Sequence, residues 1–423
     1  MLQLFKNKNY SLLFTGTLVS QLGTTIYNFA IGWYLYKMDV DPFIVSLYIA
    51  TGLMIDLLLS PFIGVLVDRM NKVAILVITD IIRGSAILIA GFVFFSGISL
   101  DQSIVLLFIA TIILAINGSF FGISSFSLLP NVVEKNELQQ ANSLFSIVQS
   151  AQRIFGVLLG AAFYELVGIE MVFIINGVSY LLSAVSEMFI RIHVQKPVLI
   201  KSKEKVKQFF TEFKEGIGFV MHEEGMFVFL ITIVMLNFSV APLFTNGLPY
   251  LLSNVLDVNS YQLSYINVAS AVGMIIGSII IGTISKKVKL RETVFRGMIF
   301  QTGMFAFLGM MMVLISNDVI PYNIFILGFM FFTFLFGVAN MAVNIPLNSS
   351  IVMLIDEDKR GRVIGVVSFM ANGATPLALL IGGLMLRSGR MEPIVLFTVI
   401  LTTITVVFMI KNGKINKLLD SLS

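Results

Sequence analysis

The sequence contains no cysteine, only two histidines and a single tryptophan among its 423 residues. The missing cysteine excludes disulfide bonds, thiolate metal sites and cysteine nucleophiles. Both histidines, His193 and His222, fall in one hydrophilic stretch, so no apolar segment has a histidine for metal binding or proton relay. We therefore expect a protein that is not an enzyme and that needs no metal and no cofactor.

Charge is scarce as well. Charged residues make up 12% of the chain and hydrophobic residues 57%, and the mean hydropathy is +0.94. A soluble domain cannot bury so much apolar surface, so most of it must face lipid. The formal net charge of +4 is spread over the loops between apolar runs, which does not indicate nucleic-acid binding. The first apolar run is long and has no small-residue cleavage site, so we expect no cleavable signal peptide.

Apolar runs long enough to cross about 30 Å of hydrocarbon recur along the chain with short polar breaks. We place twelve of them at 10–36, 43–67, 73–96, 103–128, 141–165, 169–190, 226–252, 262–284, 293–316, 321–349, 362–386 and 392–410. The predicted fold class is therefore an all-α integral membrane protein with 12 transmembrane helices.

The basic residues of the loops predict the orientation, since cytoplasmic loops carry an excess of Lys and Arg. If both termini are cytoplasmic, the outer loops receive only Lys37, Arg387 and Arg390, and the inner loops receive nearly all the other basic residues. We expect a multi-pass protein of the cell membrane, in the bacterial plasma membrane, with both ends inside.

The longest polar break, 191–225, separates six spans from six. Phe209, Phe213, Ile217 and Val220 recur there at helical spacing between Lys and Glu residues, which predicts an amphipathic helix on the inner membrane surface or a solvated linker with an apolar face. The halves also resemble each other: "IIRG" at 81–84 corresponds to "VFRG" at 294–297. We predict an N-terminal six-helix bundle over 1–190, a linker over 191–225 and a C-terminal six-helix bundle over 226–423, with a substrate site between the bundles.

A charged motif follows the second span. "GVLVDRMNK", from Gly64 to Lys72, resembles the signature loop of the major facilitator superfamily, G-x-L-a-D-r-x-x-r/k, in residue types, spacing and position between spans two and three. The segments at 18–36, 76–84, 129–144 and 248–282 are similar to the bacterial macrolide-efflux-like drug and siderophore exporters. The resemblance implies the twelve-helix facilitator fold in two pseudo-symmetric bundles, alternating access and proton-driven export.

The resemblance also implies a cytoplasmic latch that closes when the transporter opens outward. Its predicted residues are Gly64, Asp68, Arg69, Lys72, Asp80 and Arg83. Gly64 would let the second and eleventh spans approach closely. The alternative is static ion pairing at the lipid interface. In the second half, Arg296 mirrors Arg83, and Arg360 and Arg362 lie in the corresponding loop.

Two charges stand at matching depth in the second and fifth spans. Asp56 lies twelve residues before Asp68, and Arg153 twelve residues after Ala141, so each is roughly 18 Å from the inner end of its helix. Such charges in hydrocarbon usually face a cavity or a partner. We predict that Asp56 binds the transported proton and that Arg153 is its electrostatic counterpart or an anchor for an anionic substrate group. The alternative is a permanent pair that fixes helix packing.

Uncharged polar residues of the apolar spans are candidates for lining the cavity. They are Gln21, Asn28, Asn117, Gln149, Gln152, Asn237, Asn246, Asn340, Asn344 and Asn348. Hydrogen bonding between helices is the alternative for each one. Glu187, one turn before Arg191, is interpreted as snorkelling towards the inner interface.

The predicted function is proton-coupled efflux of amphiphilic small molecules, with the proton gradient as driving force. The expected partners are such a substrate and membrane lipids, with no nucleic acid, and we expect a monomer. Uptake or flipping of an amphiphile such as a lysolipid is one alternative, and a membrane-embedded lipid enzyme is another. Two departures from related exporters bear on coupling: "LAINGSFFG" from Leu114 carries no arginine, and Val157 stands where proline is usual.

Overall fold

A computed structural model describes residues 2–67, 70–134, 137–191, 202–222, 225–284, 288–355 and 360–421. These residues form helices and short connections, with no strand among them. Contacts between Cα atoms divide the chain into two compact units. Unit 1 comprises Met1–Asp39 and Tyr48–Phe209, and unit 2 comprises Val40–Leu47 and Phe210–Ser423. The domain limits at 190 and 226 stay a prediction.

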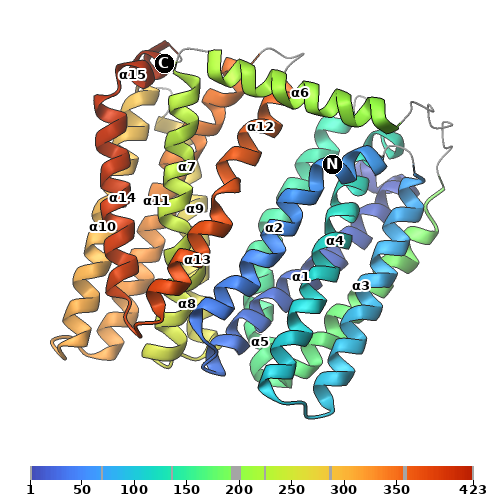
Figure 1. The fold of residues 1–423 in the computed structure, drawn as a ribbon, viewed down its shortest axis with the longest axis horizontal. Helices are drawn as coiled ribbons and strands as arrows, with labels where there is room; N and C mark the ends of the chain where they lie inside the picture. The colour runs from blue at the N-terminus through green and yellow to red at the C-terminus, as the bar shows by residue number, and fades with distance from the viewer. Residues whose placement is uncertain are drawn as a thin grey trace. The chain divides into compact units, whose positions relative to one another are not determined.

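Unit 1 is built from long helices that Figure 1 labels. A short turn of 3-10 helix, Leu2–Lys6, precedes α1 (Lys8–Lys37). The other helices are α2 (Pro42–Val67), whose first turn belongs to unit 2, α3 (Lys72–Phe95), α4 (Leu100–Val132) and α5 (Leu138–Met188). Asn7, Asn71 and Ser99 cap the N-termini of α1, α3 and α4 by accepting hydrogen bonds from backbone N–H groups.

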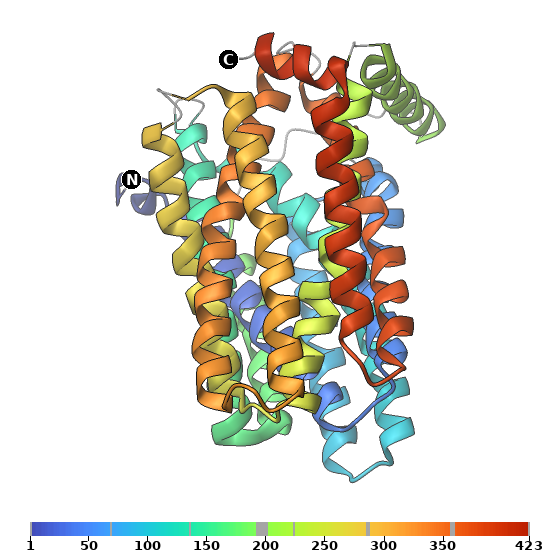
Figure 2. The same cartoon turned by 90° about the vertical axis from the view of Figure 1, so that its left-hand side faces the viewer.

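The larger segment of unit 2, Phe210–Ser423, begins within α6 (Ser202–His222). It continues with α7 (Met226–Pro242), a π-helical turn (Leu243–Gly247), α8 (Leu248–Tyr250), a second π-helical turn (Leu251–Val255), α9 (Ser260–Ile284), α10 (Leu290–Ser316), α11 (Tyr322–Leu354), α12 (Arg360–Gly373), α13 (Thr375–Leu386), α14 (Glu392–Lys411) and α15 (Gly413–Ser421). Figure 2 shows α10, α11 and α14 running side by side.

Ten helices in the described part of the chain are long and apolar enough to cross a membrane. Two further features bring this number to the predicted twelve spans. α1 has 30 residues but is not among the ten, and α5 has 51 residues with a break at Gly168, where φ is +81°. Glycine adopts this left-handed conformation without the steric cost that a side chain brings. The break separates the predicted fifth and sixth spans, so the twelve-helix fold is confirmed.

Glycines bring the first and fifth spans of each half into close contact. A methyl group at Gly156 of α5 would lie 2.4 Å from the Thr25 side chain of α1. A methyl group at Gly382 of α13 would lie 2.8 Å from the Pro242 side chain of α7. The same pair of spans therefore packs through small residues in both halves, as expected for a structural repeat.

The amphipathic helix of the linker is present as α6, but the described part of its apolar face contacts protein. Val220 is buried at 1% exposure in the core of unit 2, and Phe213 and Ile217 pack against that core. The ring of Phe213 also meets Phe369 of α12 edge-on, with centroids 5.5 Å apart. The prediction that this face lies on the membrane surface is wrong for these three residues.

Candidate functional site

Asp56 lies near the middle of α2, and its side chain is exposed. One oxygen, Oδ1, accepts a hydrogen bond from Ser119 Oγ of α4 at 2.6 Å and another from Ser60 Oγ at 3.3 Å. Each serine also has a backbone acceptor four residues earlier, at 2.9 Å for Ser119 and 2.5 Å for Ser60. The hydroxyl hydrogens therefore have a second acceptor whenever Asp56 takes up a proton.

Arg153, the predicted counterpart of Asp56, lies in α5, but its side chain is outside the described residues. The pairing of the two charges therefore stays a prediction.

The signature loop is described only at its edges. Asp68 and Arg69 are outside the described residues. Lys72 begins α3, and its Nζ donates to the carbonyl oxygen of Ser127 at 2.8 Å, which ties α3 to α4. The close approach of the second and eleventh spans predicted at Gly64 stays a prediction. Close contact occurs at Gly383 of α13, which lies against Ser46 and Phe43.

Three ionisable side chains meet in the interior of unit 1. Asp80 and Arg83 form an ion pair one turn apart on α3, and their exposures are 0% and 4%. The Arg83 guanidinium lies over the rings of Phe121 (α4) and Tyr180 (α5), 4.4 and 4.5 Å from their centroids. Glu187 of α5 is also buried, at 0% exposure, and the charges of Asp80 and Arg83 act on it. The interpretation of Glu187 as a snorkelling residue is wrong.

The same cluster lies at one end of a polar face on α5. The residues of this face are Asn176, Ser179, Ser183 and Glu187. The face packs against glycines of α1: Ser179 and Asn176 lie beside Gly23, and Ser183 and Glu187 lie beside Gly16. Spacings of three and four residues place polar groups on one side of a helix. That periodicity was the available signal in the sequence, and the prediction missed it.

The predicted amides of unit 1 occupy different surroundings. Asn28 is exposed and Gln21 is half-buried. Asn117 donates to the Ile113 carbonyl of its own helix, and Gln152, which is buried, donates to the Leu18 carbonyl of α1 at 3.2 Å. Gln152 thus serves helix packing in this structure and does not line an open cavity. The side chain of Gln149 is outside the described residues.

In unit 2, two amides join helices. Asn237 of α7 donates to the Ala371 carbonyl of α12 at 3.0 Å. Asn246 is fully buried and donates to the Leu379 carbonyl of α13 at 2.8 Å, so the cavity-lining prediction is wrong for Asn246. Asn344 is exposed and donates to Asn340 Oδ1 at 2.9 Å, whereas the Asn348 side chain is outside the described residues.

The predicted latch residues of the second half differ from their first-half counterparts. Arg296 pairs with Glu292 on the same helix at 3.0 Å, and its side chain is 74% exposed, so it does not share the buried surroundings of Arg83. The side chains of Arg360 and Arg362 are outside the described residues.

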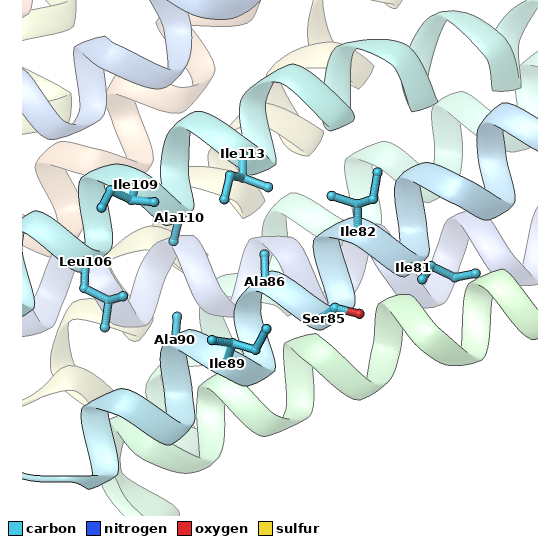
Figure 3. Close-up of a pocket in the computed structure, with 10 residues that line it drawn as sticks. All are labelled: Ile81, Ile82, Ser85, Ala86, Ile89, Ala90, Leu106, Ile109, Ala110 and Ile113. Carbon is cyan, nitrogen blue, oxygen red and sulfur yellow. The ribbon is translucent and has the colours of Figure 1, made fainter.

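A shallow hollow of about 430 Å³ lies between α3 and α4 in unit 1 (Figure 3). Its lining is apolar apart from the hydroxyl of Ser85. Among the lining residues are Ile82, Ile89, Ile109 and Ile113, and none of the predicted site residues is included. The hollow offers no charge and one hydroxyl, so it is not the polar site that the sequence predicts.

Two six-span halves with glycine-packed first and fifth spans, and the signature sequence between the second and third spans, define a recognisable architecture. The family model of the Major Facilitator Superfamily matches residues 13–372. The chain belongs to the Major Facilitator Superfamily. As a facilitator it is a membrane transporter and not an enzyme.

Relatives of this facilitator include transporters of bacteria. The chain is 29% identical over 300 residues to the uncharacterized MFS-type transporter YkuC of Bacillus subtilis (strain 168), covering 68% of this chain and 67% of that protein. It is 22% identical over 390 residues to macrolide efflux protein A of Streptococcus pyogenes, covering 90% and 89%. A bacterial homologue of the iron transporter ferroportin, solved in an inward-facing state, shares the fold with a TM-score of 0.74 and 16% identity, covering 95% and 98%.

Proposed function

We propose that this facilitator exports amphiphilic small molecules across the bacterial plasma membrane in exchange for protons, by alternating access. The observation that supports proton coupling is the carboxylate of Asp56 in the middle of α2. The Ser119 and Ser60 hydroxyls near it can also donate to backbone carbonyl oxygens. When Asp56 is protonated, its carboxyl group can donate to Ser119 Oγ, while the Ser119 hydroxyl hydrogen keeps a backbone carbonyl as its acceptor. A charge at this depth is costly in a lipid environment, so a neutral and an ionised form favour different surroundings.

The proposed direction of transport and the proposed substrate class rest on sequence similarity to an efflux protein. Macrolide efflux protein A is similar to this chain over nearly its whole length. In our proposal Arg153 is the counter-charge of Asp56 or the anchor of an anionic substrate group, and the transporter works as a monomer with both termini in the cytoplasm. Exposed amides such as Asn28 and Asn344 would contact the substrate, together with Met and aromatic surfaces that adapt to several ligands.

The test uses inverted membrane vesicles that contain the full-length protein, with a cationic dye and a labelled macrolide as probes. Wild-type vesicles should accumulate a probe when their lumen is acidified. Asp56→Asn should reduce this accumulation to the level of vesicles without the protein, because asparagine cannot bind and release a proton. Glu165→Gln, an exposed acid of α5, is the matched control and should transport normally.

Full gradient-driven transport by Asp56→Asn at normal expression would remove Asp56 from the coupling step. Accumulation that requires an alkaline lumen would instead support uptake. Movement of a fluorescent lysolipid without any gradient would support flipping, the remaining alternative.

A further inference from the structure

The proposed coupling step leaves the buried cluster of Asp80, Arg83 and Glu187 without a role. The cluster holds two carboxyl groups and one guanidinium, all less than 5% exposed. Among the described residues, Arg83 is the cation whose charge acts on either carboxyl. With all three groups ionised, this cluster would carry one uncompensated negative charge. An uncompensated buried charge is strongly unfavourable, and the group usually neutralises instead.

Among the residues that the structure describes, no second cation faces the cluster. The facing side chains are Asp80 and Arg83 from α3, Phe121 from α4, and Tyr180, Ser183 and Glu187 from α5, with Gly16 of α1 closing the fourth side. The Tyr180 hydroxyl lies 2.8 Å from Thr24 Oγ1 of α1, which gives it a partner outside the cluster. The neutral groups therefore contribute hydroxyls and rings, and they do not supply a second positive charge.

The hydrogen bonds of the cluster independently favour one neutral carboxyl group. Asp80 Oδ2 and Glu187 Oε2 are both buried without a described donor. Ser183 donates to Glu187 Oε1 at 3.3 Å, and the same hydroxyl also interacts with Asp80. A serine hydroxyl has one hydrogen, so it can donate to only one of two ionised carboxylates. A single added proton turns one carboxyl into a donor and reduces this deficit.

We propose that this cluster is a proton-binding site in which Glu187 carries one proton while Asp80 remains ionised and paired with Arg83. The proton comes from water and returns to it, so binding neutralises one negative charge and no other bond changes. Glu187 is assigned as the carrier because the Arg83 guanidinium contacts the Asp80 oxygen directly. The site is separate from Asp56, which is exposed on α2, so unit 1 would hold two proton-binding groups in different surroundings.

The experiment is infrared spectroscopy of purified full-length protein, in which a protonated carboxyl shows a C=O stretch that a carboxylate lacks. The spectrum of wild type minus Glu187→Gln at neutral pH should contain this band. Glu165→Gln, the exposed control on the same helix, should leave it unchanged. Because Gln reproduces the shape and the neutrality of a protonated Glu, Glu187→Gln should retain the helicity and thermal stability of wild type.

A second variant tests the charge balance. In Asp80→Asn, Glu187 becomes the remaining acid near Arg83, so it should lose its proton and the band should disappear. Retention of the band in Asp80→Asn would overturn the proposal, and so would a wild-type band that Glu187→Gln leaves in place. These spectra require no transport, so they succeed or fail independently of the role assigned to Asp56.

Discussion

At the scale of single residues, Asp41 and Arg387 form an ion pair within unit 2. Arg387 Nε donates to both carboxylate oxygens of Asp41, at 3.1 and 2.9 Å, and its guanidinium lies 4.9 Å from the centroid of the Phe43 ring. Asp41 also accepts from the Phe43 N–H at 2.8 Å, which caps the start of α2. These bonds, chiefly the one to Arg387, lower the pKa of Asp41 from its ordinary value.

The variant Asp41→Asn should remove the charge and keep the cap, since asparagine caps helices as well as aspartate does. A lowered folded-state pKa means that ionised Asp41 stabilises the fold above its unfolded pKa of about 3.9, and that this contribution is lost as the pH falls through the folded value. The variant should therefore melt slightly below wild type at pH 7, and the difference should vanish as the pH falls below about 3.9 and through the lowered pKa of folded Asp41.

Thermal unfolding in detergent checks this, with Arg387→Gln as the second arm of a double-mutant cycle. The effect should be small and should shrink with salt, because the side chains are 49% (Arg387) and 36% (Asp41) exposed. A difference that persists unchanged at low pH would show that another interaction causes it.

At the scale of helices, α9 and α11 cross with their backbones in contact. A methyl group at Gly273 of α9 would lie 2.0 Å from the Phe334 carbonyl oxygen, and one at Gly337 of α11 would lie 2.3 Å from the Ser270 carbonyl oxygen. Backbone atoms cannot rotate away as a side chain does. Gly273 and Gly277 also form the small-xxx-small spacing that lets membrane helices approach closely.

Gly273→Ala should therefore force α9 and α11 apart and destabilise the protein by about 1–3 kcal/mol, the range of overpacked sites. Gly303→Ala on α10 is the matched control, because a methyl group there meets no heavy atom within 4 Å. The control should be neutral or slightly more stable, since alanine favours helices. Melting temperatures of the purified variants decide the comparison, and equal values for the two would contradict the close crossing.

At the scale of the whole molecule, the absence of cysteine allows the orientation to be measured without background labelling. Ser96→Cys at the end of α3 and Lys214→Cys on α6 are both at exposed positions. With cytoplasmic termini, a membrane-impermeant maleimide should label Ser96→Cys in intact cells and Lys214→Cys only after permeabilisation. The opposite pattern would invert the orientation that we infer from the basic loops.

Local patterns predicted the helices well and their contacts poorly. Uninterrupted hydropathy located the spans, and even the break at Gly168 lies between two runs that were placed separately. Single polar residues were harder to interpret, because an amide in an apolar run can face a cavity or another helix. Asn246 and Asn28 look alike in sequence, yet one is fully buried against α13 and the other is exposed.

The amino-acid sequence by itself determined that this is a twelve-helix membrane transporter of the facilitator family, because run length, hydropathy and the signature loop are properties of neighbouring residues. Only the tertiary structure decided which charges meet. Glu187 stands one turn from Arg191 in sequence, but the packing of α3 against α5 places it with Asp80 and Arg83, about a hundred residues earlier. Such contacts depend on helix rotation and offset, which residues distant in the chain set together.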